Sequence, residues 1–332
     1  MQRCFTSMQE LQPGTKWKNL FRERWPAYHK WLQSTSPFVD SKTALAALMQ
    51  YMPEMRPTHD RLCSLVEAED MASAFLTGFQ PPAYFSACSQ VVSTLDEVQL
   101  VRNYDYHADR FEANLLMTAW NGKKVIASSD CLVGVLDGMN NDGLALSLTF
   151  GGRKTLGFGF GIPFILRYIL EFCSTVDEAV EVLLRVPSHM AYNVTITDKT
   201  GQVKTVQLAP DKSAHVSDRA FATNHQEAIE WKENADFNRT MERAIHIEGL
   251  LRTEQTGEEL TREFLKAPLY NTRYSEGLGT LYTAVYRPQK GEVQLHWQND
   301  QMTQSFDSFT EEQKFISFQF PEQSPKSIRA IK

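Results

Sequence analysis

The chain has 332 residues, of which 42% are hydrophobic and 22% charged, with a formal net charge of −6. The acidic balance, and the lack of any basic run of about five residues, argue against a nucleic-acid-binding protein and against a polybasic membrane patch. The N-terminal residues lack an apolar signal segment, and no run of about 18 apolar residues occurs. We therefore expect a globular protein of the cytoplasm, without a secretory signal or membrane anchor.

The cysteines are odd in number, scattered and without a CxxC pair, which favours neither a zinc site nor a disulfide framework. We expect them to be reduced and mostly buried, and we expect no cofactor and no metal. They are Cys4, Cys63, Cys88, Cys131 and Cys173.

Residues 1–87 predict a helical leader. Apolar residues at spacings of three and four indicate a first helix, interrupted by Pro26, and Asp40 can cap a second. Pro81 and Pro82 then end helical structure, so an extended segment precedes Cys88. The expected helices cover residues 16–34, 42–52 and 58–78.

After Cys88 the pattern becomes that of β-strands, with Asn121-Gly122 as a hairpin turn. The expected strands are 89–93, 98–103, 115–120, 124–128, 132–136, 144–150, 192–197, 203–208, 215–217, 280–286 and 292–297. A glycine-rich loop over 151–161 leads to an apolar helix over 163–173. Thr175 and Glu178 fit a capping box for a helix over 179–185. Residues 225–266 are helical and charged, and a polar tail follows the last strand.

This order does not alternate as βαβ units do. It predicts an α+β fold of two antiparallel sheets covered by helices, with residues 1–87 as leader and 88–332 as the main domain.

Cys88 is the residue around which a function can be built. A cysteine that becomes the first residue of a chain carries its own base, because an α-amine has a pKa of about 7.7–8.0. Such a thiol needs a partner that orients the amine, donors for an oxyanion and an extended cut site. A cut between Ala87 and Cys88 would free this nucleophile.

Other interpretations stay open. Cys88 could be a packing residue at a strand start, and Arg102 to Asp105 a strand end with a solvated ion pair. His225 could serve as the base of a Cys–His hydrolase, although the protease signatures around the cysteine are absent. His107 could line a pocket or lie on the surface.

Together the motifs resemble those of the N-terminal-nucleophile cysteine hydrolases. Within them the chain is most similar to the isopenicillin-N acyltransferase group, and more distantly to choloylglycine hydrolases. The motifs are Ala87-Cys88-Ser89, Arg102-Asn103-Tyr104-Asp105, Asp137-Gly138-Met139-Asn140 with Gly143-Leu144, Leu148-Thr149-Phe150-Gly151-Gly152, Thr223-Asn224-His225 and, more loosely, Tyr192-Asn193-Val194-Thr195 and Thr280-Leu281-Tyr282.

The resemblance implies a four-layer αββα sandwich and self-cleavage before Cys88, after which fragment 1–87 stays bound. It implies that Cys88 attacks a linear amide of a small acylated substrate through a thioester. By the same resemblance Arg102 lies beside the nucleophile, Asp105 orients the new amine and Asn224 donates to the oxyanion. Thr149 takes the place of a second oxyanion asparagine.

The chain departs from this pattern in places. Ala87 replaces the usual glycine before the cysteine, and no C-terminal catalytic arginine is placed: Arg273 is a candidate, but an exposed ionic role is the favoured interpretation of this residue. The substrate, the choice between hydrolase and acyltransferase, and homo-oligomer formation stay open. A non-catalytic ligand-binding protein and a Cys–His hydrolase using His225 are the alternative functions.

Overall fold

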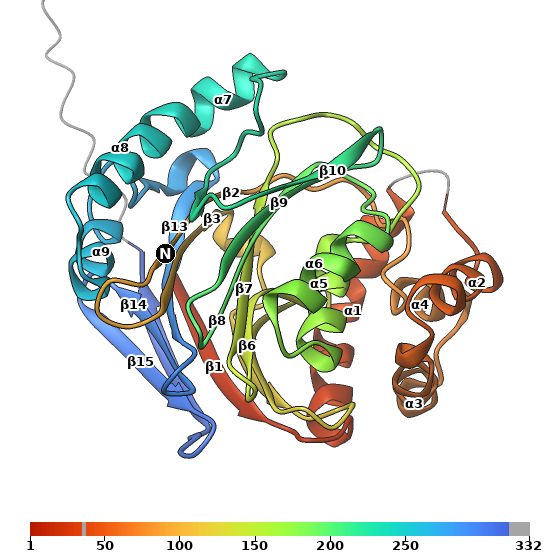
Figure 1. The fold of residues 1–332 in the computed structure, drawn as a ribbon. Helices are drawn as coiled ribbons and strands as arrows, with labels where there is room; N and C mark the ends of the chain where they lie inside the picture. The colour runs from red at the N-terminus through yellow and green to blue at the C-terminus, as the bar shows by residue number, and fades with distance from the viewer. Residues whose placement is uncertain (35–37, 319–332) are drawn as a thin grey trace, which may run out of the picture.

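The computed structural model describes residues 1–34 and 38–318, which form two facing β-sheets covered by helices (Figure 1). Within these residues the sheets have nine and seven strands. No described helix has the length and apolar character needed to cross a membrane.

The first sheet is antiparallel except where β1 pairs with β4. Its strands, in spatial order, are β10 (Lys212–Ser217), β9 (Val203–Ala209), β8 (Tyr192–Asp198), β7 (Leu144–Phe150), β6 (Gly134–Asn140), β5 (Val125–Asp130), β4 (Asn114–Thr118), β1 (Gln2–Gln9) and β16 (Glu312–Ser317).

The second sheet is antiparallel and contains Cys88 in β2. Its order is β11 (Phe221–Ala222), β2 (Ala87–Ser93), β3 (Gln99–Tyr106), β13 (Leu278–Arg287), β14 (Glu292–Trp297) and β15 (Asp300–Ser305), and β12 (Thr272–Arg273) pairs with β13.

The layers follow the predicted αββα order. Figure 1 shows helices α5 (Ile162–Phe172) and α6 (Val176–Arg185) outside the first sheet, and α8 (Thr240–Arg252) and α9 (Gly257–Phe264) outside the second. Strand β2 packs on β7 and β8 across the sandwich. Every residue of β2, β5, β6, β7 and β8 is buried, because each of these strands lies between the facing sheet and a layer of helices. The α+β class and its two sheets are confirmed.

Several local predictions are also confirmed. Asn121 and Gly122 lie in the connection between the antiparallel pair β4 and β5. The Thr175 and Glu178 side chains form both bonds of a capping box at the start of α6. The charged segment 225–266 is helical in three pieces, α7 (Lys232–Asn238), α8 and α9.

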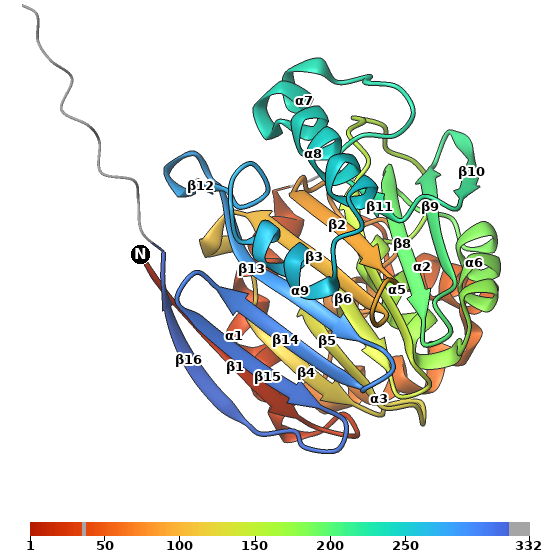
Figure 2. The same cartoon turned by 60° about the vertical axis from the view of Figure 1, so that its left-hand side comes forward.

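The leader is not wholly helical, which corrects the prediction for its first residues. Residues 2–9 form β1, which pairs in parallel with β4 and antiparallel with β16 (Figure 2). Phe5 and Ser7, two residues apart on one face of this strand, are both buried, but its sequence does not alternate polar and apolar residues and so gave no strand signal. The division of the chain at 87/88 remains a prediction.

The leader helices differ in detail from those expected. Helix α1 (Thr15–Gln33) runs through Pro26 without a break. The single helix expected over 58–78 is two helices, α3 (Arg56–Val66) and α4 (Asp70–Phe75), separated where Glu67 adopts a left-handed φ of 52°. The remaining helix, α2 (Ser41–Tyr51), matches the expected second helix, and a short turn of 3₁₀-helix (Pro53–Met55) follows it.

Two further boundaries were wrong. The strand expected over 132–136 begins later, at Gly134, and continues as β6 to Asn140. The expected polar tail contributes β15 and β16 to the two sheets. Its last part, 319–332, lies outside the described residues.

Candidate active site

Cys88 is the second residue of β2, and its side chain is completely buried. In the β2–β3 ladder it lies opposite Tyr104, while Ala87 lies opposite Asp105. Opposed residues and residues two apart share a face of a sheet, so Cys88, Gln90 and Arg102 face the first sheet. The Gln90 amide confirms this orientation, because it lies 2.6 Å from the Ser147 hydroxyl of β7.

Arg102 brings a cation to the sulfur. One guanidinium nitrogen, Nη2, donates to Cys88 Sγ at 3.3 Å, and Nη1 forms a buried ion pair with Asp137. The Asp137 carboxylate also accepts hydrogen bonds from Tyr282 at 2.7 Å and Tyr286 at 2.6 Å. Asp137 therefore fixes the guanidinium in the orientation that presents Nη2 to the thiol.

Asn224 holds the backbone at the cut site. Its Oδ1 accepts from the Cys88 N–H at 2.9 Å, and its Nδ2 donates to the carbonyl of Ser86 at 3.4 Å and to that of Phe150 at 3.2 Å. The Nδ2 group thus lies one peptide unit from the Ala87 carbonyl that a thiol would attack. In the continuous chain Nδ2 donates to the Ser86 and Phe150 carbonyls, so its role as oxyanion donor at Ala87 remains a prediction.

Arg243 of α8 is a site residue that the sequence reasoning missed. It is 2% exposed, and it donates to the Cys88 carbonyl at 2.5 Å, to Ser89 Oγ at 2.8 Å and to Asn224 Oδ1 at 2.7 Å. It therefore connects the candidate nucleophile with the candidate oxyanion donor. Arg273, the arginine proposed from the sequence, instead pairs with Glu276 and donates to the Phe237 carbonyl.

Asp105 lies on the helix-facing side of the hairpin, beside the Cys88 backbone. Its Oδ1 accepts from Thr280 at 2.7 Å, whereas its buried Oδ2 has no hydrogen-bond partner. Burial raises the pKa of Asp105 to about 6, and Arg243 and the Thr280 hydrogen bond oppose this shift. An unpartnered carboxylate oxygen at this position can accept a hydrogen bond from a new α-amine at Cys88.

One comparison with known proteins identifies the family of the chain. Residues 92–302, more than half of the chain, match the model of the acyl-coenzyme A:6-aminopenicillanic acid acyl-transferase family. The chain belongs to this family. The match confirms the resemblance found in the sequence, and it begins after Cys88, so it does not include the candidate nucleophile.

Solved structures of other proteins also match the chain, whereas no curated protein matches. A mutant conjugated bile acid hydrolase from Clostridium perfringens is 13% identical with a TM-score of 0.45, over 71% of this chain and 99% of its own. An N-acylethanolamine-hydrolyzing acid amidase ortholog from Caenorhabditis elegans is 17% identical with a TM-score of 0.45, over 61% and 93%. Penicillin V acylase from Agrobacterium tumefaciens is 14% identical with a TM-score of 0.46, over 68% and 90%.

In this acyl-transferase family member, Thr149 supports the segment around Asn224. Its hydroxyl donates to the Thr223 carbonyl at 2.8 Å. The Asn193 amide nitrogen lies 3.0 Å from Thr149 Oγ1, 2.9 Å from the Thr223 carbonyl and 3.0 Å from the His225 carbonyl. Thr149 and Asn193 thus donate hydrogen bonds to the carbonyls of the residues before and after Asn224. In the continuous chain the Thr149 hydroxyl is used for this support and not for the scissile carbonyl.

Replacement of Asn193 with alanine is expected to slow any cut before Cys88 by roughly 10-fold to 100-fold, because Asn224 loses two of its three supports. The same loss is expected for Thr149→Val, with recovery in Thr149→Ser, which keeps the hydroxyl. Intact-mass spectrometry over time measures the cut fraction. Gln226→Ala is the control, because this buried amide donates to Tyr192 and Leu208 carbonyls instead. Equal rates for Asn193→Ala and Gln226→Ala would contradict a role of Asn193 in positioning Asn224.

The histidines named in the sequence analysis lie outside this network. His225 Nδ1 lies 2.9 Å from Thr240 Oγ1 and 3.1 Å from Thr223 Oγ1. Burial, together with Arg219 and Arg243, lowers the pKa of His225 to about 4. The ring nitrogen of His107 accepts from the Asp109 N–H in the turn after β3. Among the described residues, neither histidine has a hydrogen bond with Cys88.

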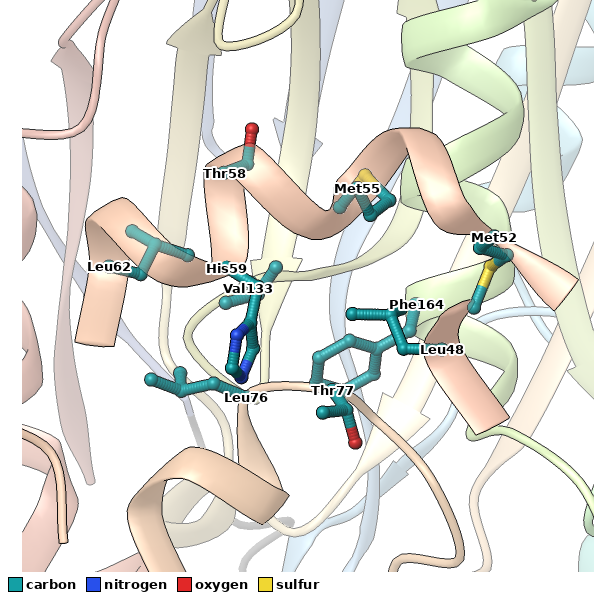
Figure 3. A pocket seen from close by; sticks show the side chains of 10 residues that line it. All are labelled: Leu48, Met52, Met55, Thr58, His59, Leu62, Leu76, Thr77, Val133 and Phe164. Atoms are coloured by element: carbon teal, nitrogen blue, oxygen red, sulfur yellow. The ribbon is translucent and has the colours of Figure 1, made fainter. Parts of the chain in front are cut away.

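A small cavity lies elsewhere, between the leader helices and α5 (Figure 3). Its volume of about 10 Å³ is roughly the room for one water molecule. Apolar side chains such as Leu48, Met52 and Phe164 line it together with His59. It is too small for a substrate.

Proposed function

We propose that the protein is an N-terminal-cysteine amidohydrolase or acyltransferase that acts on a linear amide bond of a small acylated substrate. Cys88 first cuts the bond that precedes it, and fragment 1–87 stays bound. Family membership supports the reaction class. One observation carries the proposal: two side chains bind Cys88. Arg102 donates a hydrogen bond to its sulfur at 3.3 Å, and Asn224 accepts a hydrogen bond from its N–H at 2.9 Å.

Self-cleavage begins when Cys88 Sγ attacks the Ala87 carbonyl carbon. Asn224 Nδ2 donates to the oxygen on which negative charge develops. The C–N bond to Cys88 then breaks, the nitrogen takes up the thiol proton, and an Ala87 thioester remains on the sulfur. Water hydrolyses this thioester, which leaves a carboxylate on Ala87 and a free α-amine on Cys88.

Turnover repeats the same chemistry on an external amide. The α-amine of Cys88, oriented by Asp105, takes the proton of the thiol and transfers it to the leaving amine when the substrate C–N bond breaks. Arg102 stays beside the sulfur throughout. Water or an acceptor amine then attacks the thioester, the acyl group leaves, and the thiol is restored.

Intact-mass spectrometry of purified protein tests the proposal. We expect wild type to give two chains split between residues 87 and 88, and Cys88→Ala to give a single chain of 37.9 kDa. Cys173→Ala, which removes a buried thiol outside the site, is expected to split as wild type does.

The two alternatives give different results in the same experiment. A folded wild-type protein that stays a single chain would contradict self-cleavage and favour a ligand-binding member of the family. Amide hydrolysis by a single chain, lost on His225→Ala, would favour a Cys–His hydrolase.

A further inference from the structure

Ser86, two residues before Cys88, places a hydroxyl group beside the thiol. Its side chain is buried, being 7% exposed, and its Oγ forms a hydrogen bond with Cys88 Sγ at 3.8 Å. The Ser86 carbonyl accepts from Asn224 Nδ2 at 3.4 Å, while Asn224 Oδ1 accepts from the Cys88 N–H at 2.9 Å. One amide side chain therefore fixes residues 86 and 88 relative to each other.

The continuous chain lacks the base that the cut enzyme would have. The α-amine of Cys88 exists only after the bond to Ala87 breaks, because until then this nitrogen belongs to an amide. A thiol is a poor nucleophile while it keeps its proton, and the ordinary pKa of a cysteine is about 8.5. The cut before Cys88 therefore needs a different group to receive the thiol proton.

The contacts of the sulfur restrict the choice of this group. Over residues 1–34 and 38–318, two side chains form hydrogen bonds with Cys88 Sγ, those of Arg102 and Ser86. Arg102 is a permanent cation and cannot accept a proton. A serine hydroxyl has one proton to donate and two lone pairs with which to accept. Ser86 is thus the contact of the sulfur that can both receive and release a proton.

Asp105 and His225, the titratable side chains considered for catalysis, form hydrogen bonds elsewhere. Asp105 lies on the opposite face of the β2–β3 hairpin and accepts from Thr280 at 2.7 Å. The ring of His225 lies 2.9 Å from Thr240 Oγ1. In the described part of the chain neither side chain has a hydrogen bond with Cys88 Sγ, so neither is placed to take its proton directly.

We infer that the Ser86 hydroxyl carries the thiol proton to the Cys88 nitrogen during the cut. The inference rests on the proposed function and adds a catalytic residue to its first step. Serine hydroxyls commonly reach the backbone nitrogen two residues further along the chain, which is where the proton is needed.

The proton transfer balances. As Cys88 Sγ bonds to the Ala87 carbonyl carbon, Ser86 Oγ accepts the proton of the sulfur and donates its own proton to the Cys88 nitrogen. The bond between this nitrogen and the carbonyl carbon breaks, which leaves an amine, a thioester and an unchanged hydroxyl. Ser86 acts once, because it lies on fragment 1–87 and the free α-amine takes over its role after the cut.

The pH dependence of the cut in Ser86→Ala tests the inference. Without the hydroxyl the proton has to leave to solvent, so the cut requires the thiolate. We expect the rate of this variant to rise roughly 10-fold for each pH unit between 6 and 8, and to be roughly 100-fold below wild type at pH 7. The wild-type rate should change less than about 3-fold over this range, because the proton stays within the site.

The proteins are made by cell-free translation, and the cut fraction is followed by intact mass at pH 6, 7 and 8 after translation is stopped. Ser86→Thr keeps a hydroxyl and is expected to recover most of the rate with the wild-type pH dependence. Ser86→Gly should behave as Ser86→Ala does, so the test does not depend on one folded variant. Ser93→Ala, which removes a buried hydroxyl at the other end of β2, is the control and should cut as wild type does.

Two results would overturn the inference alone: a Ser86→Ala protein that cuts at the wild-type rate, or one that is slowed by the same factor at all three pH values. The second result would mean that Ser86 only positions the thiol. A wild-type protein that stays uncut at every pH, as Cys88→Ala does, would overturn the inference together with the proposed self-cleavage.

Discussion

Replacement of Arg243 with methionine is expected to slow the cut before Cys88 by roughly 100-fold to 1000-fold, the loss that follows removal of an oxyanion-stabilising group. Arg243 does not reach the thiol. It fixes the Cys88 carbonyl and Asn224 Oδ1 at once, with bonds of 2.5 Å and 2.7 Å. Without it each of the two buried acceptors loses a hydrogen bond from a cation, while Asn224 Oδ1 keeps its bond from the Cys88 N–H, and we expect a cost of about 1–3 kcal/mol of folding free energy. The cut rate is measured by intact mass, and stability by urea unfolding of the uncut protein.

Arg273→Met is the matched control for Arg243→Met. Its side chain is 27% exposed and forms a surface ion pair with Glu276, so we expect a change in stability below about 1 kcal/mol and a normal cut rate. Arg243→Lys keeps the charge but has one nitrogen for three acceptors, and partial activity is expected. A slow Arg273→Met protein beside a normal Arg243→Met protein would show that Arg273, and not Arg243, supports the cut.

Replacement of Asp105 with asparagine is expected to change rate and stability in opposite directions. The cut should slow about 100-fold, because the carboxylate that anchors the newly formed amine of Cys88 is lost. Stability should rise at neutral pH, because the buried charge is removed. A shift of the Asp105 pKa from 3.8 to about 6 corresponds to roughly 3 kcal/mol at most.

The pH dependence gives the sign of this stability effect. A carboxyl group with a raised pKa in the folded state destabilises the fold above about pH 6, and the penalty disappears as the pH falls towards 3.8. The gain from Asp105→Asn should therefore be full at pH 8 and small at pH 4. Urea unfolding of Cys88→Ala and of Cys88→Ala/Asp105→Asn at both pH values measures it in an uncut chain. An equal difference at the two pH values would exclude Asp105 as its origin.

Much of the fold could be predicted because its signals are local. Alternation, the Asn121-Gly122 turn and the Thr175 capping box each act over a few residues. Strand β1 was not predicted because its neighbours in the sheet, β4 and β16, are distant from it in the sequence. The division of the expected third helix at Glu67 was also not predicted, since a left-handed φ at a glutamate has no sequence signature.

The candidate site was predictable where family motifs mark it. Cys88, Arg102, Asp105 and Asn224 come together as the motif order implied, and their catalytic roles remain predictions. Arg243 was missed because a charged helix suggests a solvated surface. Its spacing held a signal, since Thr240, Arg243, Ala244 and Ile247 follow the helical period and all are buried. An arginine within such an apolar stripe is the pattern to look for.

The position of β1 has a consequence for any product of the cut. Strand β1 lies between β4 and β16, so the smaller fragment would supply an interior strand of a sheet whose other strands belong to the larger one. Trp17 of the same fragment is buried and donates to the Leu132 carbonyl at 2.9 Å. The two fragments would share one sheet. Their separation would break the hydrogen bonds of β1 with β4 and with β16, and it would leave β16 without its neighbour. Removal of one covalent bond would then change the chemistry at Cys88 while the architecture stays that of one molecule.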